Sequence, residues 1–141
     1  MRKMRVLIAE DDPDTRFLLS LVLKEQGYDI VSARDGVEAV ALAEKTPPDL
    51  IIVDQMMPRM TGSDCVRTLR ANPALCQVAV VLVTAAAGLV RGTEHLHLDA
   101  VVEKPVELEG FVRTVRTLCP PGPERRVATI PFHVDRRQGS S

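Results

Sequence analysis

Short apolar runs alternate along the chain with segments of helical periodicity. The apolar runs, which predict strands, are residues 5–9, 29–33, 50–53, 78–83 and 101–102. Apolar side chains at three- and four-residue spacing predict helices over residues 13–26, 36–46, 63–71 and 108–118. A strand followed by a helix, repeated in this way, is typical of α/β proteins.

Helix boundaries follow from a few punctuating residues. Asp12 and Pro13 predict the start of the first helix, because Asp accepts hydrogen bonds from the first amides and Pro presets φ. Gly27 ends that helix, and Pro47-Pro48 ends the second. The first helix therefore has both a start and a stop signal, and the second has a stop signal.

Strands that are nearly all apolar predict a parallel sheet covered on both faces, with right-handed crossovers. We expect an α/β fold with a five-stranded parallel sheet over residues 1–118. Between the fourth and fifth strands the pattern is weak, and Gly88 and Gly92 predict a short helix there, since glycine weakens helices. Residues 119–141 are rich in Pro and Arg without periodicity, which predicts a linker or disorder, although residues 127–134 have the composition of one short strand.

Composition narrows the functional classes. Eighteen Lys and Arg against nineteen Asp and Glu give a formal net charge of −1, which does not favour binding to nucleic acid or to anionic lipid. No apolar stretch approaches the roughly 18 residues of a membrane helix, so we expect a cytoplasmic protein. Cys65, Cys76 and Cys119 lack metal-ligand spacing, and we expect them to be ordinary thiols.

Polar side chains follow four of the predicted strands where each strand ends. These residues are Glu10 and Asp11 after the first strand, Asp54 after the third, Thr84 after the fourth and Lys104 after the fifth. The carboxyl ends of parallel strands share one edge of the sheet, and ligands of open parallel sheets bind there. We therefore expect the five side chains to form one site.

Three carboxylates brought together repel one another unless a cation neutralises them. An all-oxygen site suits Mg²⁺, which Glu10 and Asp11 would hold. Asp54 is the candidate nucleophile, because carboxylates form aspartyl-phosphate intermediates. Lys104 and Thr84 would bind the oxygens of a phosphoryl group. The residues thus predict phosphoryl transfer to Asp54.

Four separated motifs occur in a family order and spacing: Glu10-Asp11, Asp54 with Met57-Pro58 and Gly62, Thr84, and Lys104-Pro105. With these motifs, residues 4–118 resemble a response-regulator receiver domain, the phosphoacceptor module of bacterial two-component signalling. The chemotaxis regulators have the same module.

The resemblance implies a doubly wound five-stranded sheet in the order 2-1-3-4-5. It also implies Mg²⁺-dependent phosphorylation of Asp54 by a sensor histidine kinase or a histidine phosphotransfer protein, and a switched downstream protein partner. The backbone carbonyl of Met56 would be a further metal ligand, and the peptide bond before Pro105 would be cis. A module of this kind is a signalling domain and not an enzyme that turns over a separate substrate.

The chain departs from the family pattern mainly where the signal is read out. Val101 replaces the aromatic residue that usually lies three positions before Lys104 and turns inward on activation. Met56 and Ala86 occupy the places whose side chains flank the attacking water, and apolar groups there predict a long-lived phosphoaspartate. Glu10 replaces the commoner Asp and is still long enough to reach a metal.

Two other functions remain open at this point. A phosphorylation-independent adaptor with a receiver fold is motivated by Val101 and by the unusual segment before the fifth strand. A hydrolase of the haloacid-dehalogenase type also uses an aspartyl nucleophile and Mg²⁺, but it needs a second Asp where this chain has Met56.

Overall fold

The computed structural model of the protein describes residues 3–85 and 96–122. In this part of the chain five strands form one parallel sheet in the order β2-β1-β3-β4-β5. The strands are β1 (Arg5–Ala9), β2 (Asp29–Ala33), β3 (Leu50–Asp54), β4 (Ala79–Thr84) and β5 (Ala100–Glu103). The predicted α/β fold is confirmed, and so is the strand order that the resemblance implied.

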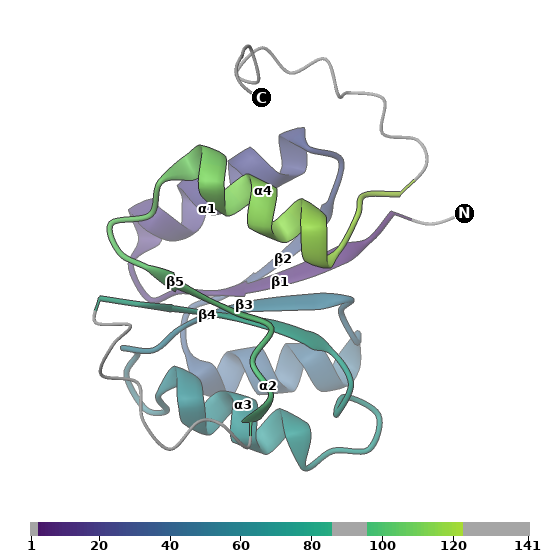
Figure 1. Ribbon diagram of the computed structural model, residues 1–141. Helices are drawn as coiled ribbons and strands as arrows, with labels where there is room; N and C mark the ends of the chain where they lie inside the picture. Colours follow the sequence, from purple (N-terminus) through teal and green to yellow (C-terminus); the bar gives the residue numbers. More distant parts are fainter. Residues whose placement is uncertain (1–2, 86–95, 123–141) are drawn as a thin grey trace.

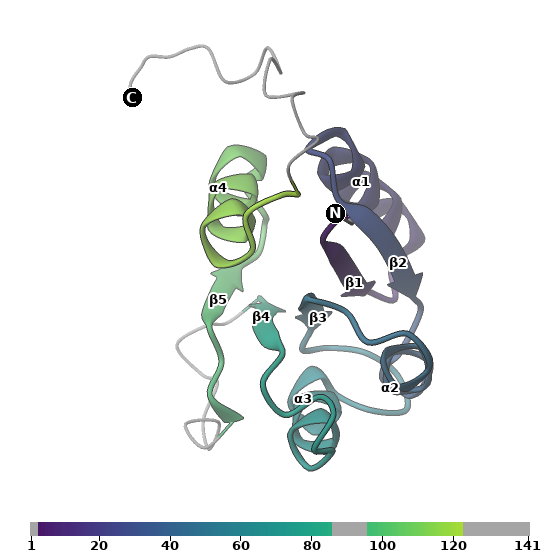
Figure 2. The same ribbon diagram turned by 90° about the vertical axis from the view of Figure 1, so that its right-hand side faces the viewer.

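The helices of the described residues lie on both faces of this sheet. They are α1 (Pro13–Glu25), α2 (Gly36–Lys45), α3 (Gly62–Arg70) and α4 (Leu108–Leu118). α1 and α4 cover one face, and α2 and α3 cover the other (Figure 1, Figure 2). None of these helices is long and apolar enough to cross a membrane.

Each helix begins after a side chain that accepts a hydrogen bond from its first turn. The capping residues are Asp12 for α1, Asp35 for α2, Thr61 for α3 and Glu107 for α4. Such caps satisfy amide hydrogens that have no partner inside the helix. At the other end of α1, Gly27 takes φ 98°, a left-handed conformation that favours glycine.

The hydrophobic core has two halves, one on each side of the sheet. Under α1 and α4 it contains Val6, Ile8, Leu19, Leu23, Ile52, Val81, Phe111 and Val115. Under α2 and α3 it contains Leu7, Ala39, Ala43, Ile51, Val53, Val66, Leu69 and Leu82. β1, β3 and β4 therefore bury side chains on both faces, which explains their continuous apolar sequences.

The structure shows which apolar side chains of α1 face the core. α1 buries Leu19 and Leu23, whereas Phe17, Leu18 and Leu21 are exposed. α1 is apolar on more than one stripe, so spacing alone does not identify the buried face. The expected short helix between β4 and β5 and the short strand at residues 127–134 fall on segments outside the described residues, and the boundary at residue 118 stays a prediction.

Arg70, at the end of α3, ties two distant chain segments together. Its guanidinium donates hydrogen bonds to the carbonyl oxygens of Cys76 and Val78 before β4, at 2.9 and 2.6 Å. It also donates to the carbonyl oxygens of Leu96 and His97 before β5, at 2.8 and 2.9 Å. These bonds fix the point at which the chain returns to the sheet to form β5.

Tyr28 anchors the end of α4 to the start of β2. Its buried hydroxyl donates a hydrogen bond to the carbonyl oxygen of Cys119, 91 positions away in the sequence. Burial raises the pKa of the Tyr28 phenol, so the group remains a neutral donor. The bond links α4 to the sheet at the amino ends of the strands, opposite their carboxyl ends.

We expect Tyr28→Phe to lower the free energy of unfolding by about 1 to 2 kcal/mol, because the buried Cys119 carbonyl loses its hydroxyl donor. Urea denaturation followed by circular dichroism measures this loss. Thr117→Val is the matched control: its hydroxyl also donates to a backbone carbonyl, but at the exposed surface of α4. Equal stability losses for the two variants would contradict the anchoring role of Tyr28.

Candidate functional site

Three carboxylates meet at the carboxyl edge of the sheet. Glu10 and Asp11 follow β1, and Asp54 ends the neighbouring strand β3. One carboxylate oxygen of each residue lies within 4.8 Å of the others. Glu10 and Asp54 are buried, whereas Asp11 is exposed. The structure therefore brings together the three acids that the strand ends predicted.

Lys104 reaches the same place from the end of β5. Its Nζ lies 2.9 Å from Asp54 Oδ2 and 3.5 Å from Glu10 Oε1. Partial burial alone would lower the pKa of the Lys104 ammonium, but the hydrogen bond and charge of Asp54 outweigh it and the pKa is raised. The peptide bond between Lys104 and Pro105 is cis. One ammonium thus faces two buried carboxylates.

The environment of Glu10 opposes its negative charge. Burial is the main cause that raises the pKa of Glu10 to about 7, and the nearby charge of Asp54 adds to it. A hydrogen bond from the Asp12 amide to Glu10 Oε2, at 3.1 Å, acts in the other direction. Near neutral pH the described residues around Glu10 therefore stabilise its negative charge only in part.

Thr84 lies beside this acidic cluster and Val101 lies further from it. Thr84 ends β4 and is buried, one residue beyond the position that pairs with Asp54 in the sheet register. Val101 pairs with Leu82, two residues before Thr84, on the edge strand β5, and its side chain is 43% exposed. The sheet thus brings Thr84, but not Val101, to the level of the carboxylates.

The loop after β3 approaches the site closely. The amide of Met56 donates a hydrogen bond to Asp54 Oδ1 at 3.2 Å, while the Met56 side chain is 69% exposed. Gly62 ends the loop so close to β3 that a Cβ there would lie 2.6 Å from the Asp54 carbonyl oxygen. Glycine is therefore required at position 62 for this loop to close.

Two residues that support the site were not singled out from the sequence. The guanidinium of Arg16 on α1 donates a hydrogen bond to the Glu10 carbonyl oxygen at 2.8 Å and so holds the turn after β1. Gln55, directly after Asp54, contacts the start of α3 through its side chain. Two sequence features could have pointed to them: Arg16 is a basic residue in the first turn of a predicted helix, and Gln55 is a polar residue at the end of an apolar strand.

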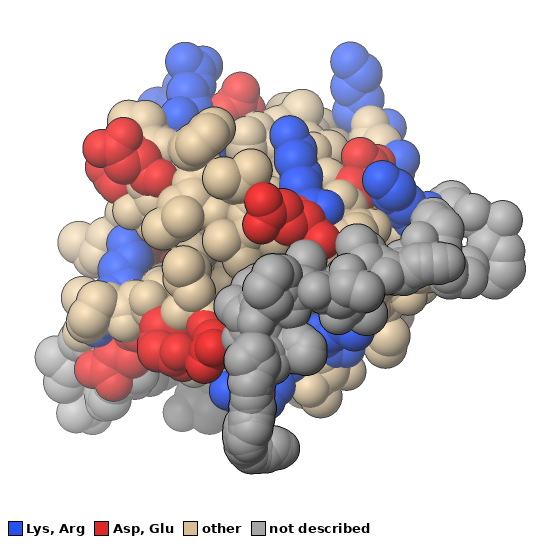
Figure 3. All heavy atoms as spheres, turned by 90° about the horizontal axis from the view of Figure 1, so that it is seen from above, with Lys and Arg blue, Asp and Glu red and all other residues tan. Residues whose placement is uncertain are grey.

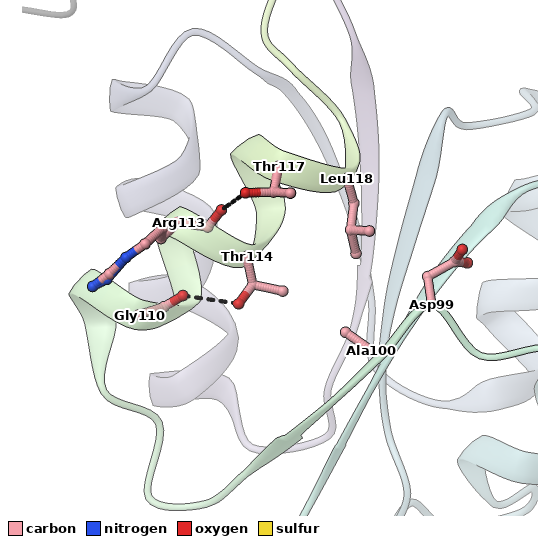
Figure 4. Close-up of a pocket in the computed structure, with 7 residues that line it drawn as sticks. All are labelled: Asp99, Ala100, Gly110, Arg113, Thr114, Thr117 and Leu118. Atoms are coloured by element: carbon pink, nitrogen blue, oxygen red, sulfur yellow. Dashed lines mark hydrogen bonds between the residues drawn. The ribbon is translucent and has the colours of Figure 1, made fainter.

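The hollow between β5 and α4 is separate from the acidic cluster. It measures about 470 Å³, and Asp99 and Ala100 lie across it from α4 (Figure 4). The hydroxyls of Thr114 and Thr117 donate to backbone carbonyls of α4 itself, so they offer no free donor to a ligand. None of the five predicted site residues lines this hollow.

The fold, the acidic cluster and the lysine agree with a match to known proteins. A sequence-family model described as the response regulator receiver domain matches residues 6–116. The chain belongs to this family.

Relatives and solved structures agree with this assignment. The DNA-binding response regulator MtrA of Mycolicibacterium smegmatis is 34% identical over 113 residues, which cover 79% of this chain and 50% of that protein. The structure of the chemotaxis response regulator CheY4 of Vibrio cholerae has a TM-score of 0.76 at 28% identity, covering 82% of this chain and 98% of that one.

A third structure is similar in fold. It is the receiver domain of a sensor histidine kinase from Pseudomonas aeruginosa, described with a magnesium ion coordinated in its active-site cleft. It has a TM-score of 0.73 at 24% identity, covering 82% of this chain and 96% of that one. The receiver module therefore occurs both in regulators and in kinases.

We expect the Glu10 carboxyl to make the metal-free protein less stable as the pH rises from 4.5 to about 7. The unfolded chain releases this proton near pH 4.5, while the folded protein keeps it up to about pH 7. The stabilisation is thus complete below the lower value and lost above the higher one. Glu10→Gln, which is neutral at every pH, removes this contribution.

Urea denaturation in EDTA at a series of pH values measures the effect as the difference between the parent protein and Glu10→Gln. The stability of the parent should fall relative to that of the variant across this pH range. Parallel curves for the two proteins would show that Glu10 does not titrate in the way its burial demands.

Proposed function

We propose that this receiver domain is phosphorylated on Asp54 in a Mg²⁺-dependent reaction and that the added charge switches binding to a protein partner. The observation that carries the proposal is the meeting of Glu10, Asp11 and Asp54 within 4.8 Å, with the Lys104 ammonium 2.9 Å from Asp54. These residues would supply a nucleophilic carboxylate, a set of cation ligands and a fixed positive charge in one place.

The donor set fits Mg²⁺. Glu10, Asp11 and Asp54 bring carboxylate oxygens together, and the Met56 carbonyl of the adjoining loop would add a neutral oxygen. Hard oxygen ligands in small number, with room for water on the exposed side of Asp11, are what this ion requires. When bound, Mg²⁺ would neutralise charge on the incoming phosphoryl oxygens.

The residues of the chain have distinct parts in the transfer. A carboxylate oxygen of Asp54 attacks the phosphorus atom, the bond from phosphorus to the donor's imidazole nitrogen breaks, and that nitrogen leaves with the electron pair. The Lys104 ammonium, which donates a hydrogen bond to Asp54 Oδ2, then donates to an oxygen of the phosphoryl group. The Thr84 hydroxyl donates to another of these oxygens.

The partners follow from this chemistry. A sensor histidine kinase or a histidine phosphotransfer protein supplies the phosphoryl group, and a protein partner reads the switched state. The domain acts on its own aspartate and has no separate substrate, so we assign it a signalling function rather than an enzymatic one. We propose that residues 1–118 form the receiver and that residues 119–141 are a Pro- and Arg-rich linker or a disordered tail.

Binding to nucleic acid is not part of the proposal for the described residues. The chain spans about half the length of the curated relative MtrA, whose name describes DNA binding by that protein. On the face formed by α1 and α4, basic and acidic side chains are interspersed wherever grey atoms do not cover the view (Figure 3). A mixed surface of this kind does not favour a polyanion.

The two alternative functions are less well supported. The haloacid-dehalogenase interpretation lacks its second acid, since position 56 is an exposed Met, and the family match is to receiver domains. The adaptor interpretation rests on Val101 and on the segment before β5, part of which lies outside the described residues. The proposed function is supported instead by the three acids and Lys104, which lie together at the carboxyl edge of the sheet. Phosphorylation itself separates these interpretations.

We expect incubation with Mg²⁺ and acetyl phosphate to add one phosphoryl group to the protein, seen by intact mass spectrometry. Asp54→Ala should show no gain, because the nucleophilic oxygen is lost. Asp64→Ala, which removes an exposed carboxylate at the start of α3, is the matched control and should be modified like the parent. A gain that persists in Asp54→Ala, or no gain in any protein, would overturn the proposal.

We expect the phosphorylated protein to hydrolyse slowly in Mg²⁺, because the Met56 side chain offers the attacking water no hydrogen bond. Met56→Asn adds such a group and should hydrolyse severalfold faster, measured as the loss of the added mass with time. Ala86, the other residue of this hypothesis, lies outside the described residues. A parent protein that loses its phosphoryl group as fast as Met56→Asn would refute the hypothesis.

A further inference from the structure

Gln55 connects β3 to α3 through hydrogen bonds of both its backbone and its side chain. An apolar residue at this position could make only the backbone bonds. Its backbone amide donates to the Val83 carbonyl oxygen at 2.8 Å, and its carbonyl oxygen accepts from the Gly62 amide at 3.0 Å. Its side-chain Oε1 accepts from both the amide and the hydroxyl of Ser63, at 2.8 and 2.9 Å. The backbone bonds are open to any residue, whereas the side-chain bonds require an acceptor.

The direction of the Gln55 amide group follows from its partners. The Ser63 backbone N–H can only donate, so the atom that faces it must be the carbonyl oxygen of the Gln55 side chain. Ser63 is buried and lies in the first turn of α3, where amides have no partner within the helix. The Gln55 side chain therefore closes the neck of the loop of residues 55–62 and satisfies a buried donor.

This loop holds two backbone groups that matter for the site. The Met56 amide donates to Asp54 Oδ1, while Lys104 occupies Oδ2, so the loop and the lysine together set the orientation of the Asp54 carboxylate. The Met56 carbonyl is the proposed neutral metal ligand. Both groups directly follow Gln55, and a shift of the loop at its neck moves them.

We propose that Gln55 is a positioning residue. Its hydrogen bonds to Ser63 hold the Met56 backbone in place, so that the Met56 amide orients Asp54 and the Met56 carbonyl can bind the metal. The inference rests on the proposed function. A second contact supports it, because Arg59 at the far side of the loop donates to Asp35 Oδ2 at 2.8 Å and ties the loop to the start of α2. The loop is thus fixed to both helices of this face of the sheet.

A purely structural role for Gln55 would stabilise α3 without changing the site. The variant that decides between the two roles is Gln55→Met, which keeps the length of the side chain and removes the acceptor. Thr61→Ala is the matched control, since it removes another hydrogen bond at the same helix start, from the Asp64 amide to the Thr61 hydroxyl at 3.1 Å. Both variants weaken α3, but only the first opens the neck of the loop.

Three readouts on the full chain test the proposal. In metal-free protein, amide hydrogen exchange at Ser63 should be faster in Gln55→Met than in the parent. Calorimetric titration with MgCl₂ should show affinity weakened about tenfold in Gln55→Met, as is usual for residues that support metal ligands. At saturating Mg²⁺ the rate of phosphorylation by acetyl phosphate should also fall. Thr61→Ala should lower the melting temperature and leave Mg²⁺ affinity unchanged.

The outcomes separate this inference from the proposed function. If the parent protein ignores Mg²⁺, the proposed function fails and this inference fails with it. If the parent binds Mg²⁺ and Gln55→Met binds it equally well, or if Thr61→Ala weakens binding as much, only the positioning role is overturned. Should Gln55→Met not fold, Ser63→Ala, which removes one of the two bonds, must show a smaller loss of Mg²⁺ affinity for the proposal to stand.

Discussion

The mutual repulsion of carboxylates at one edge of the sheet is the constraint on which the rest of this structure depends. Glu10 and Asp54 are both buried, and both face the ammonium of Lys104. Taking charges out of water costs free energy unless opposite charges compensate them. Burial, together with the nearby charge of Asp54, raises the pKa of Glu10, so the described protein groups compensate its charge only in part. Under the proposed function, a divalent cation would supply the missing charge and so create a positive site for the phosphoryl group.

A site of this kind needs a rigid support, and the sheet provides one. β1 and β3 are neighbours in the centre of the sheet, and both are buried on both faces by packed side chains. Such strands cannot move apart to relieve repulsion without exposing apolar surface. The charge therefore stays at the strand ends, where water and ions have access through the exposed Asp11.

The features that the sequence predicted well are those determined by strand periodicity. The apolar runs mark the buried strands, so the residues that follow them must lie at one edge of a parallel sheet, as Glu10, Asp54 and Lys104 do. The order of the strands within the sheet, which sets how close these residues lie, came from the resemblance to receiver domains. The supports of the site were not predictable in this way. The bond from Ser63 to Gln55 depends on how the intervening loop closes, and no periodic pattern encodes that. The buried face of α1 was ambiguous for a different reason: Leu18 and Leu19 are equally apolar, and only the packing of the sheet selects Leu19.

Two sets of contacts are available to transmit a change at Asp54 to the rest of the molecule. On one side, Oδ2 contacts Lys104, which continues into β5 and its exposed Val101. On the other side, Oδ1 contacts the Met56 amide in a loop that is fixed to α3 through Gln55. With valine in place of an aromatic side chain, the first route has little side-chain volume to move. The loop route has polar bonds that break or re-form when the Asp54 carboxylate changes its acceptor geometry. Under the proposed function, a phosphoryl group on Asp54 would therefore act on α3 as directly as on β5, and a partner would read the signal at the surface over α3.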